Sequence, residues 1–138
     1  MLANKSYIPS PYIKKKIKDG ASGKERVIFK PKFYPDQCIH WAMMQVIEPH
    51  IAKGMYEYSC GSVPKRGIHY AQKRIRRWIE NDKKHTKYIL QIDIKKFYPN
   101  VKQNILKQML RTKFKDKDLL WLLDEIIDSV ENGLPIGN

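Results

Sequence analysis

The sequence has few cysteines, a shortage of acidic residues and no long apolar run. Its two cysteines, Cys38 and Cys60, have no second pair beside them, so neither a zinc site nor a disulfide framework is indicated, and we expect both to be reduced. No stretch approaches the roughly 20 apolar residues of a membrane span, and the N-terminal MLANKSYIPSPYIKKK lacks the apolar core of a signal peptide. We therefore expect a cytoplasmic protein with no membrane partner.

The shortage of acids leaves a large positive charge. There are 27 lysines and arginines against 14 acidic residues, which gives a net charge of +13. Such a charge attracts polyanions, of which nucleic acid is the commonest partner and an anionic membrane the second. The 138 residues, 42% of them hydrophobic, are enough for one compact domain with a core.

The charge is also segregated along the chain. Residues 1–34 and residues 64–88 each contain nine basic and two acidic residues, whereas residues 116–131 contain one basic and six acidic residues. The segregation predicts that the surface that binds a polyanion and the acidic surface lie on different parts of the fold.

Local patterns predict a hairpin and two helices in the first part of the chain. PYIKKKIK and KERVIFK are strand-like runs separated by the turn-forming DGASG. PDQCIHWAMMQVIE then predicts a core helix that stops before Pro49, and MYEYSCGSVPKRG a loop with aromatic anchors. A second helix starts near Ile68, and we expect one side of it to pack, with apolar residues at Ile68, Ala71, Ile75, Trp78 and Ile79.

The second part predicts a strand and two more helices. Residues 87–94 alternate with a period of two, which is typical of a strand. Asn100 and Asp116 are candidate caps for the two following helices, and Gly133 for the end of the second. A strand with a buried face needs partner strands, which are not evident here. We therefore expect the front portion of a larger α+β domain with an incomplete sheet.

Asp93 is an acid at the end of this apolar segment. A rigid strand end can present a carboxylate to Mg²⁺, which prefers one or two carboxylates together with substrate phosphates. The alternative role of Asp93 is to cap the turn that follows it, which is the commoner role of a single Asp at a strand end.

Several motifs resemble those of the reverse transcriptases. DIKKFYPNV resembles motif A of that family and GLPIG, which begins at Gly133, resembles motif B. Upstream, GKERVIFKP is similar to the basic finger strand of the family, PDQCIHWAMMQVIEP to its first helix and YSCGSVPKRGIHYAQKRI to its Ser-x-Gly to Arg-Gly region. The resemblance covers nearly the whole chain and implies a right-hand polymerase fold, with fingers at 1–87 and part of the palm at 88–138.

The resemblance implies a role for each matching residue. Asp93 is expected to bind the first of two Mg²⁺ ions with the main-chain carbonyl of Ile94, in two-metal phosphoryl transfer. Tyr98 falls where the family has its steric gate against the 2′-hydroxyl; its alternative role is a core aromatic. Residues expected to bind the nucleotide are Lys24, Arg26, Lys96, Phe97, Tyr98, Ile136 and Gly137. Residues expected to follow the template backbone are Arg66, Gly67, Lys73, Arg74 and Arg77.

The alternatives for these bases are solvated faces, including a hairpin edge that uses charge against aggregation. Ile136 departs from the glutamine of most members and is similar to the enzymes of diversity-generating retroelements and related bacterial and phage groups, which suggests a less exacting polymerase. The Tyr-x-Asp-Asp of motif C is absent from the sequence. The implied partners are an RNA template, a DNA or RNA primer and dNTPs, but we expect this chain alone to be inactive. The alternative is a non-catalytic RNA-binding protein derived from a polymerase; a membrane-binding basic domain is a third, weaker reading.

Overall fold

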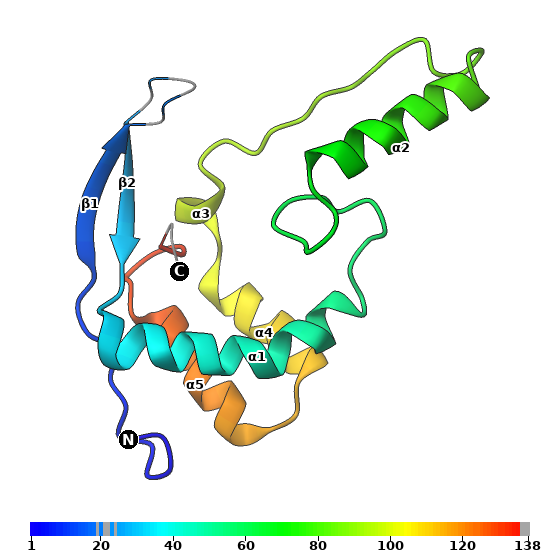
Figure 1. Cartoon of the computed structure of the whole chain (residues 1–138). Coiled ribbons are helices and arrows are strands. Elements are labelled where there is room, and N and C mark those ends of the chain that lie inside the picture. The colour runs from blue at the N-terminus through cyan, green and yellow to red at the C-terminus, as the bar shows by residue number, and fades with distance from the viewer. Residues whose placement is uncertain (19, 21–22, 24, 136–138) are drawn as a thin grey trace. The chain divides into compact units, whose positions relative to one another are not determined.

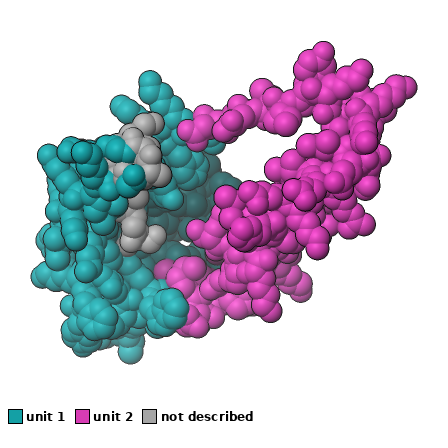
Figure 2. Space-filling model, turned by 45° about the horizontal axis from the view of Figure 1, so that its top comes forward, with its two compact units in different colours: residues 1–42, 94–138 teal, residues 43–93 magenta. Residues whose placement is uncertain are grey.

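The structure is a computed structural model that describes residues 1–18, 20, 23 and 25–135. The described elements are mixed α and β, which confirms the α+β class (Figure 1). The chain divides into two compact units, residues 1–42 with 94–138 and residues 43–93 (Figure 2). None of the described helices has the length and apolarity needed to cross a lipid bilayer.

An antiparallel hairpin opens the first unit, as predicted. Strand β1 (Ile13–Lys18) pairs with β2 (Glu25–Lys30), with Ile13 opposite Lys30 and Lys18 opposite Glu25. Directly opposite side chains share a face of the ribbon and successive ones alternate. Both faces of the hairpin therefore carry lysines, and most of its side chains are exposed.

A π-helical turn, Phe33–Gln37, leads into helix α1 (Cys38–Ala52). The prediction that this helix stops before Pro49 was wrong, because Pro49 lies inside it and its carbonyl accepts from the amide of Lys53. Proline removes one amide from a helix, and later turns can still form. The predicted apolar stripe is only partly buried: Ile39 and Ile47 are in the core, whereas Val46 is exposed.

The second unit contains helix α2 (Ile68–Asn81), close to the predicted bounds. The expectation that one side of α2 packs was wrong, since none of its described residues is buried and Ile68 is 69% exposed. Trp78 nevertheless meets Tyr58 edge to face, with ring centroids 4.5 Å apart, so the preceding loop has the predicted aromatic anchor.

Residues 88–94 are extended but form no strand, which contradicts the predicted strand over 87–94. The two-stranded sheet of β1 and β2 is the sheet that the described residues form, and it does not include this segment. Alternation favours an extended backbone, but a strand also needs a partner for its amides. The segment runs as a plain trace between α2 and α3 (Figure 1).

Three helices complete the first unit: α3 (Phe97–Asn100), α4 (Gln103–Lys113) and α5 (Lys117–Asp128). Asp116 caps α5 as predicted, with its Oδ1 accepting from the amides of Asp118 and Leu119 at 3.0 and 2.7 Å. Two other predicted boundaries were wrong. Asn100 belongs to α3, where its side-chain amide donates to the Lys95 carbonyl, and α5 ends at Asp128, well before Gly133.

The core of the chain is small and gathers on α5. Four residues of that helix are buried, and α4 packs against it. Among the described residues, the buried apolar side chains of the first unit are Tyr7, Ile39, Phe114, Leu122, Leu123, Ile126 and Ile127, and Ile47 is buried in the second unit.

Candidate functional site

The segments that resemble motifs A and B touch each other in the first unit. The Leu134 amide donates to the Tyr98 carbonyl at 2.9 Å. Gly133 is buried with φ +67°, and a Cβ added there would lie 2.7 Å from the Cα of Pro99. That distance is far shorter than any real contact, so this close approach of two backbones requires glycine. Tyr98 itself stays 44% exposed beside this junction.

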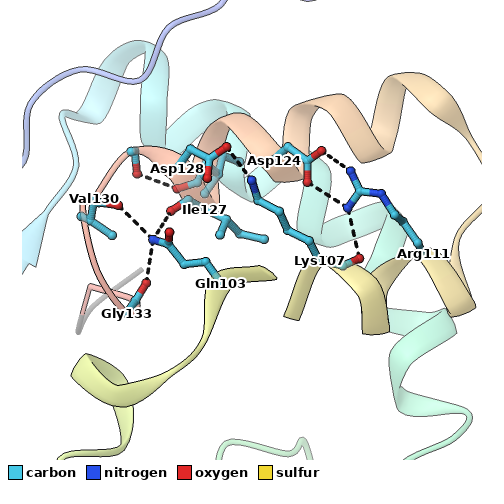
Figure 3. A network of polar contacts seen from close by, with 10 residues as sticks. Gln103, Lys107, Arg111, Asp124, Ile127, Asp128, Val130 and Gly133 are labelled. Carbon is cyan, nitrogen blue, oxygen red and sulfur yellow. Dashed lines mark hydrogen bonds and ion pairs between the residues drawn. The ribbon is translucent and has the colours of Figure 1, made fainter. Parts of the chain in front are cut away.

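Gln103, at the start of α4, holds the turn after α5. Its Nε2 donates to the carbonyls of Ile127, Val130 and Gly133 at 3.0, 2.9 and 3.1 Å (Figure 3). One amide nitrogen has two hydrogens, so the three carbonyls share them. The contact holds Gly133 in addition to the contacts from Tyr98 and Pro99, and no local sequence pattern predicts it.

A pocket of about 290 Å³ lies beside this junction. Its walls come from the segment after α3 and from the turn after α5, and they are mainly polar: Asn100, Lys102, Gln103, Asn104 and Asn132 all contribute. Amide and ammonium groups are suited to contacts with a polar or anionic ligand.

Three acids of α5 form ion pairs with bases of the first unit. Lys107 pairs with Asp128 at 2.5 Å, and Arg111 pairs with Asp124 (Figure 3). Lys5 pairs with Asp118 at 2.7 Å. The hydrogen bond to Asp124 raises the pKa of Arg111. Three of the six acids in the acidic segment are thus paired with nearby bases.

Each face of the hairpin carries three cations among apolar side chains. By the register, Arg26, Lys15 and Lys30 share one face, and Lys14, Lys16 and Lys18 share the other with Glu25. The Lys14 ammonium lies 5.8 Å from the centroid of the Phe29 ring. A ribbon of this kind can follow a phosphate backbone with charge and stack rings on bases.

Two of the predicted template-binding arginines serve the loop before α2. Arg66 donates from its guanidinium to the carbonyls of Tyr56 and Glu57 at 3.3 and 3.0 Å. Arg74 pairs with Glu57 at 3.6 Å, and its guanidinium carbon lies 5.1 Å from the centroid of the Tyr70 ring. A hydrogen bond to Tyr70 raises the pKa of Arg74. Both arginines hold the loop, which is a structural role beside the predicted one.

Of the predicted template-binding bases, Lys73 and Arg77 are the two that do not hold the loop before α2. They are exposed, and their spacing of four residues puts them on one face of the helix. Neither forms an ion pair with a described residue. Gly67 precedes the helix as its N-cap, and a Cβ there would meet nothing within 4 Å. The space around Gly67 therefore does not require glycine.

Asp93 is exposed at the end of the second unit, and Ile94 is 65% exposed. Among the residues that the structure describes, no three His, Cys, Asp or Glu side chains gather where they could hold a metal ion. One carboxylate and one main-chain carbonyl are too few ligands for a two-ion Mg²⁺ site. Phe97 and Lys96 adjoin Tyr98, with the two rings 5.4 Å apart. The predicted residues Lys24, Ile136 and Gly137 lie outside the described residues.

No protein-family model matches the sequence, and no curated protein matches it at a significant level.

Proposed function

We propose that this chain carries the nucleotide-selecting and template-following part of an RNA-directed DNA polymerase. The observation that carries the proposal is the junction of Tyr98 with Gly133 and Leu134. Two segments that resemble motifs A and B, separated by two helices, meet there through a backbone hydrogen bond and a contact that only glycine permits. A chance likeness of two short motifs gives no reason for the two to touch.

The site can select a nucleotide without any bond making. Tyr98 is 44% exposed, its backbone is held by Leu134 and the buried Gly133, and its ring lies 5.4 Å from that of Phe97. A rigid aromatic ring set against the sugar would exclude a 2′-hydroxyl by contact alone. Lys96 and Arg26 supply positive charge for a triphosphate.

The hairpin and α2 supply charge for the template and primer. Exposed lysines on both faces of β1 and β2, and Lys73 with Arg77 on α2, suit contacts to phosphates, which give affinity without reading sequence. In the polymerase proposal the hairpin belongs to the fingers and the segments around Tyr98 to the palm. The predicted division at residues 87 and 88 stays a prediction.

The proposal is tested by asking whether the chain binds a deoxyribonucleotide more tightly than the matching ribonucleotide. The binding of a dNTP and of the matching rNTP to the chain on a primer and RNA template, with Mg²⁺ present, is measured by titration. The wild type should prefer the dNTP by roughly tenfold or more, and Tyr98→Ala should bind both alike. Tyr56→Ala, which removes another exposed ring, is the control. A preference that survives Tyr98→Ala contradicts the proposal.

The single carboxylate at Asp93 favours a second function, that of a non-catalytic RNA-binding protein. A protein that kept the basic surface and lost the chemistry would bind RNA and take up no dNTP. Because the sequence lacks Tyr-x-Asp-Asp, we expect no primer extension from this 138-residue chain under either function. Nucleotide binding, and not extension, therefore separates the two; clear extension would show that Asp93 has carboxylate partners we have not identified.

A further inference from the structure

Residues 87–93, KYILQID, are an exposed, largely apolar segment that pairs with neither of the two described strands. Tyr88, Ile89, Leu90 and Ile92 are 93, 82, 83 and 77% exposed. Among the described residues, none provides a backbone hydrogen bond to the amides and carbonyls of 88–93. The segment has no glycine or proline and is rich in residues that favour strands. Such a segment is a template for another strand.

We propose that residues 87–93 pair with the same residues of a second copy of this chain, as antiparallel strands related by a two-fold axis at Leu90. The contact is isologous, so each copy gives and receives the same hydrogen bonds. The pairing goes beyond the polymerase proposal and does not depend on it.

Charge and polarity select this register. With the axis at Leu90, Tyr88 lies opposite Ile92 of the second copy and Leu90 lies opposite itself, so one face of the ribbon is wholly apolar. On the other face Lys87 lies opposite Asp93, and the two-fold axis repeats this pair. Seven residues thus provide two ion pairs and a continuous apolar face.

Neighbouring registers lose these pairs. Moving the axis to Gln91 places Lys87 opposite Lys95 and Ile89 opposite Asp93. With an axis between Leu90 and Gln91, the apolar residues of one copy would lie directly opposite the residues of the other copy's second face, which include Lys87 and Asp93. Like charges and apolar–acid pairs directly opposite each other are unfavourable. Complementary charge at the two ends therefore identifies the occupant as a second copy.

The structure also limits the length of the pairing. Before the segment, the Asp82 carboxylate and carbonyl accept from the amides of His85 and Thr86, which closes a turn. After it, Lys96 has φ +53° and the chain enters α3. A two-stranded ribbon of this length is only marginally stable. We expect a dimer that forms at high protein concentration and dissociates on dilution.

A charge exchange tests the pairing by sedimentation velocity over a concentration series. Lys87→Glu alone and Asp93→Lys alone each place like charges opposite each other twice, so each variant should stay monomeric where the wild type dimerises. An equal mixture of the two variants should dimerise, because the heterodimer keeps one native pair and gains one reversed pair. The double variant should dimerise by itself. These variants change exposed side chains, so circular dichroism should be unchanged.

Cysteine cross-linking tests the register in a background with Cys38→Ser and Cys60→Ser. Under mild oxidation Leu90→Cys should form a disulfide dimer with itself, because cross-strand neighbours are close enough for one. Ile89→Cys and Gln91→Cys should each cross-link poorly alone and readily when mixed. A wild type that is monomeric at every concentration, or single charge variants that dimerise as well as the wild type, would overturn the pairing. Neither result bears on nucleotide binding at Tyr98, so the two proposals fail separately.

Discussion

At the scale of single residues, hydrogen bonds between buried polar groups hold together segments that are far apart in the sequence. The Tyr7 hydroxyl donates to Asp36 Oδ1 at 2.7 Å, and the Ser10 amide donates to the same oxygen at 3.3 Å. Tyr7 and Asp36 are 2% and 1% exposed. Burial acts to raise the pKa of Asp36, but the hydrogen bonds from Tyr7 and Ser10, with His40 nearby, outweigh burial and lower the pKa.

The lowered pKa of Asp36 predicts that the stability of the fold depends on pH. A lowered pKa in the folded state means that the ionised Asp36 stabilises the fold above the ordinary carboxyl pKa, and that the contribution is lost as pH falls through the folded value. Tyr7→Phe should cost about 1.5–3 kcal/mol at pH 7 and less below about pH 4. Chemical denaturation at several pH values measures it.

Tyr12→Phe is the matched control for Tyr7→Phe. The Tyr12 hydroxyl meets Ser129 Oγ at 3.0 Å, a neutral pair whose contribution should not change with pH over the same range. Equal pH dependence in the two variants would contradict the role given to Asp36.

Gly133 is the other residue whose identity the packing fixes. Gly133→Ala should destabilise the first unit by about 1–3 kcal/mol, because a Cβ would meet the backbone of Tyr98 and Pro99 and because φ is positive. Gly61→Ala is the control, since a Cβ there would meet nothing within 4 Å. The free energy of unfolding of each variant decides the matter, and similar costs at both positions would refute the close approach.

At the scale of elements, local patterns predict the hairpin, α2 and the capped α5 well. Each of these depends on neighbours in sequence: alternation, turn residues, apolar spacing and a capping carboxylate. The same reasoning failed for residues 87–94, because alternation shows that a backbone is extended and not whether another strand is present to pair with it. It also failed at Asn100, whose side chain closes α3 through the Lys95 carbonyl.

The cap of α5 gives a prediction at this scale. Asp116→Ala should destabilise the chain by about 0.5–2 kcal/mol, because two amides at the start of α5 lose their acceptor. Asp116→Asn keeps an acceptor and should cost less. Thermal unfolding followed by circular dichroism compares them, and an equal loss in both variants would argue against the capping role.

At the scale of the whole molecule, the distribution of charge could be predicted in part. The basic N-terminal block and the acidic block over 116–131 are evident from composition. The pairing of those acids with Lys5, Lys107 and Arg111 is not, because it depends on how α4 and the N-terminal segment lie against α5. Likewise the motifs around Tyr98 and Gly133 are visible in the sequence, whereas their contact and the role of Gln103 appear only in three dimensions.

This distribution predicts which bases matter for RNA. Replacing Lys73 and Arg77 by Ala should weaken binding of single-stranded RNA of any sequence and reduce the dependence of log K on log salt by about 0.7 for each lost phosphate contact. Replacing Lys107 by Ala should leave the salt dependence unchanged, because Lys107 is already paired with Asp128. Fluorescence anisotropy from about 50 to 200 mM salt measures both slopes; equal slopes in the two variants would contradict this assignment.

The most direct test of the polymerase proposal is whether the template chooses the nucleotide. The chain is bound to a primer on RNA templates that differ only in the next base, and the binding of each of the four dNTPs is measured with Mg²⁺ present. The proposal predicts that the dNTP complementary to that base binds most tightly on each template, and that Gly133→Ala weakens this preference. Equal binding of all four dNTPs on every template, or no binding of any, would contradict it.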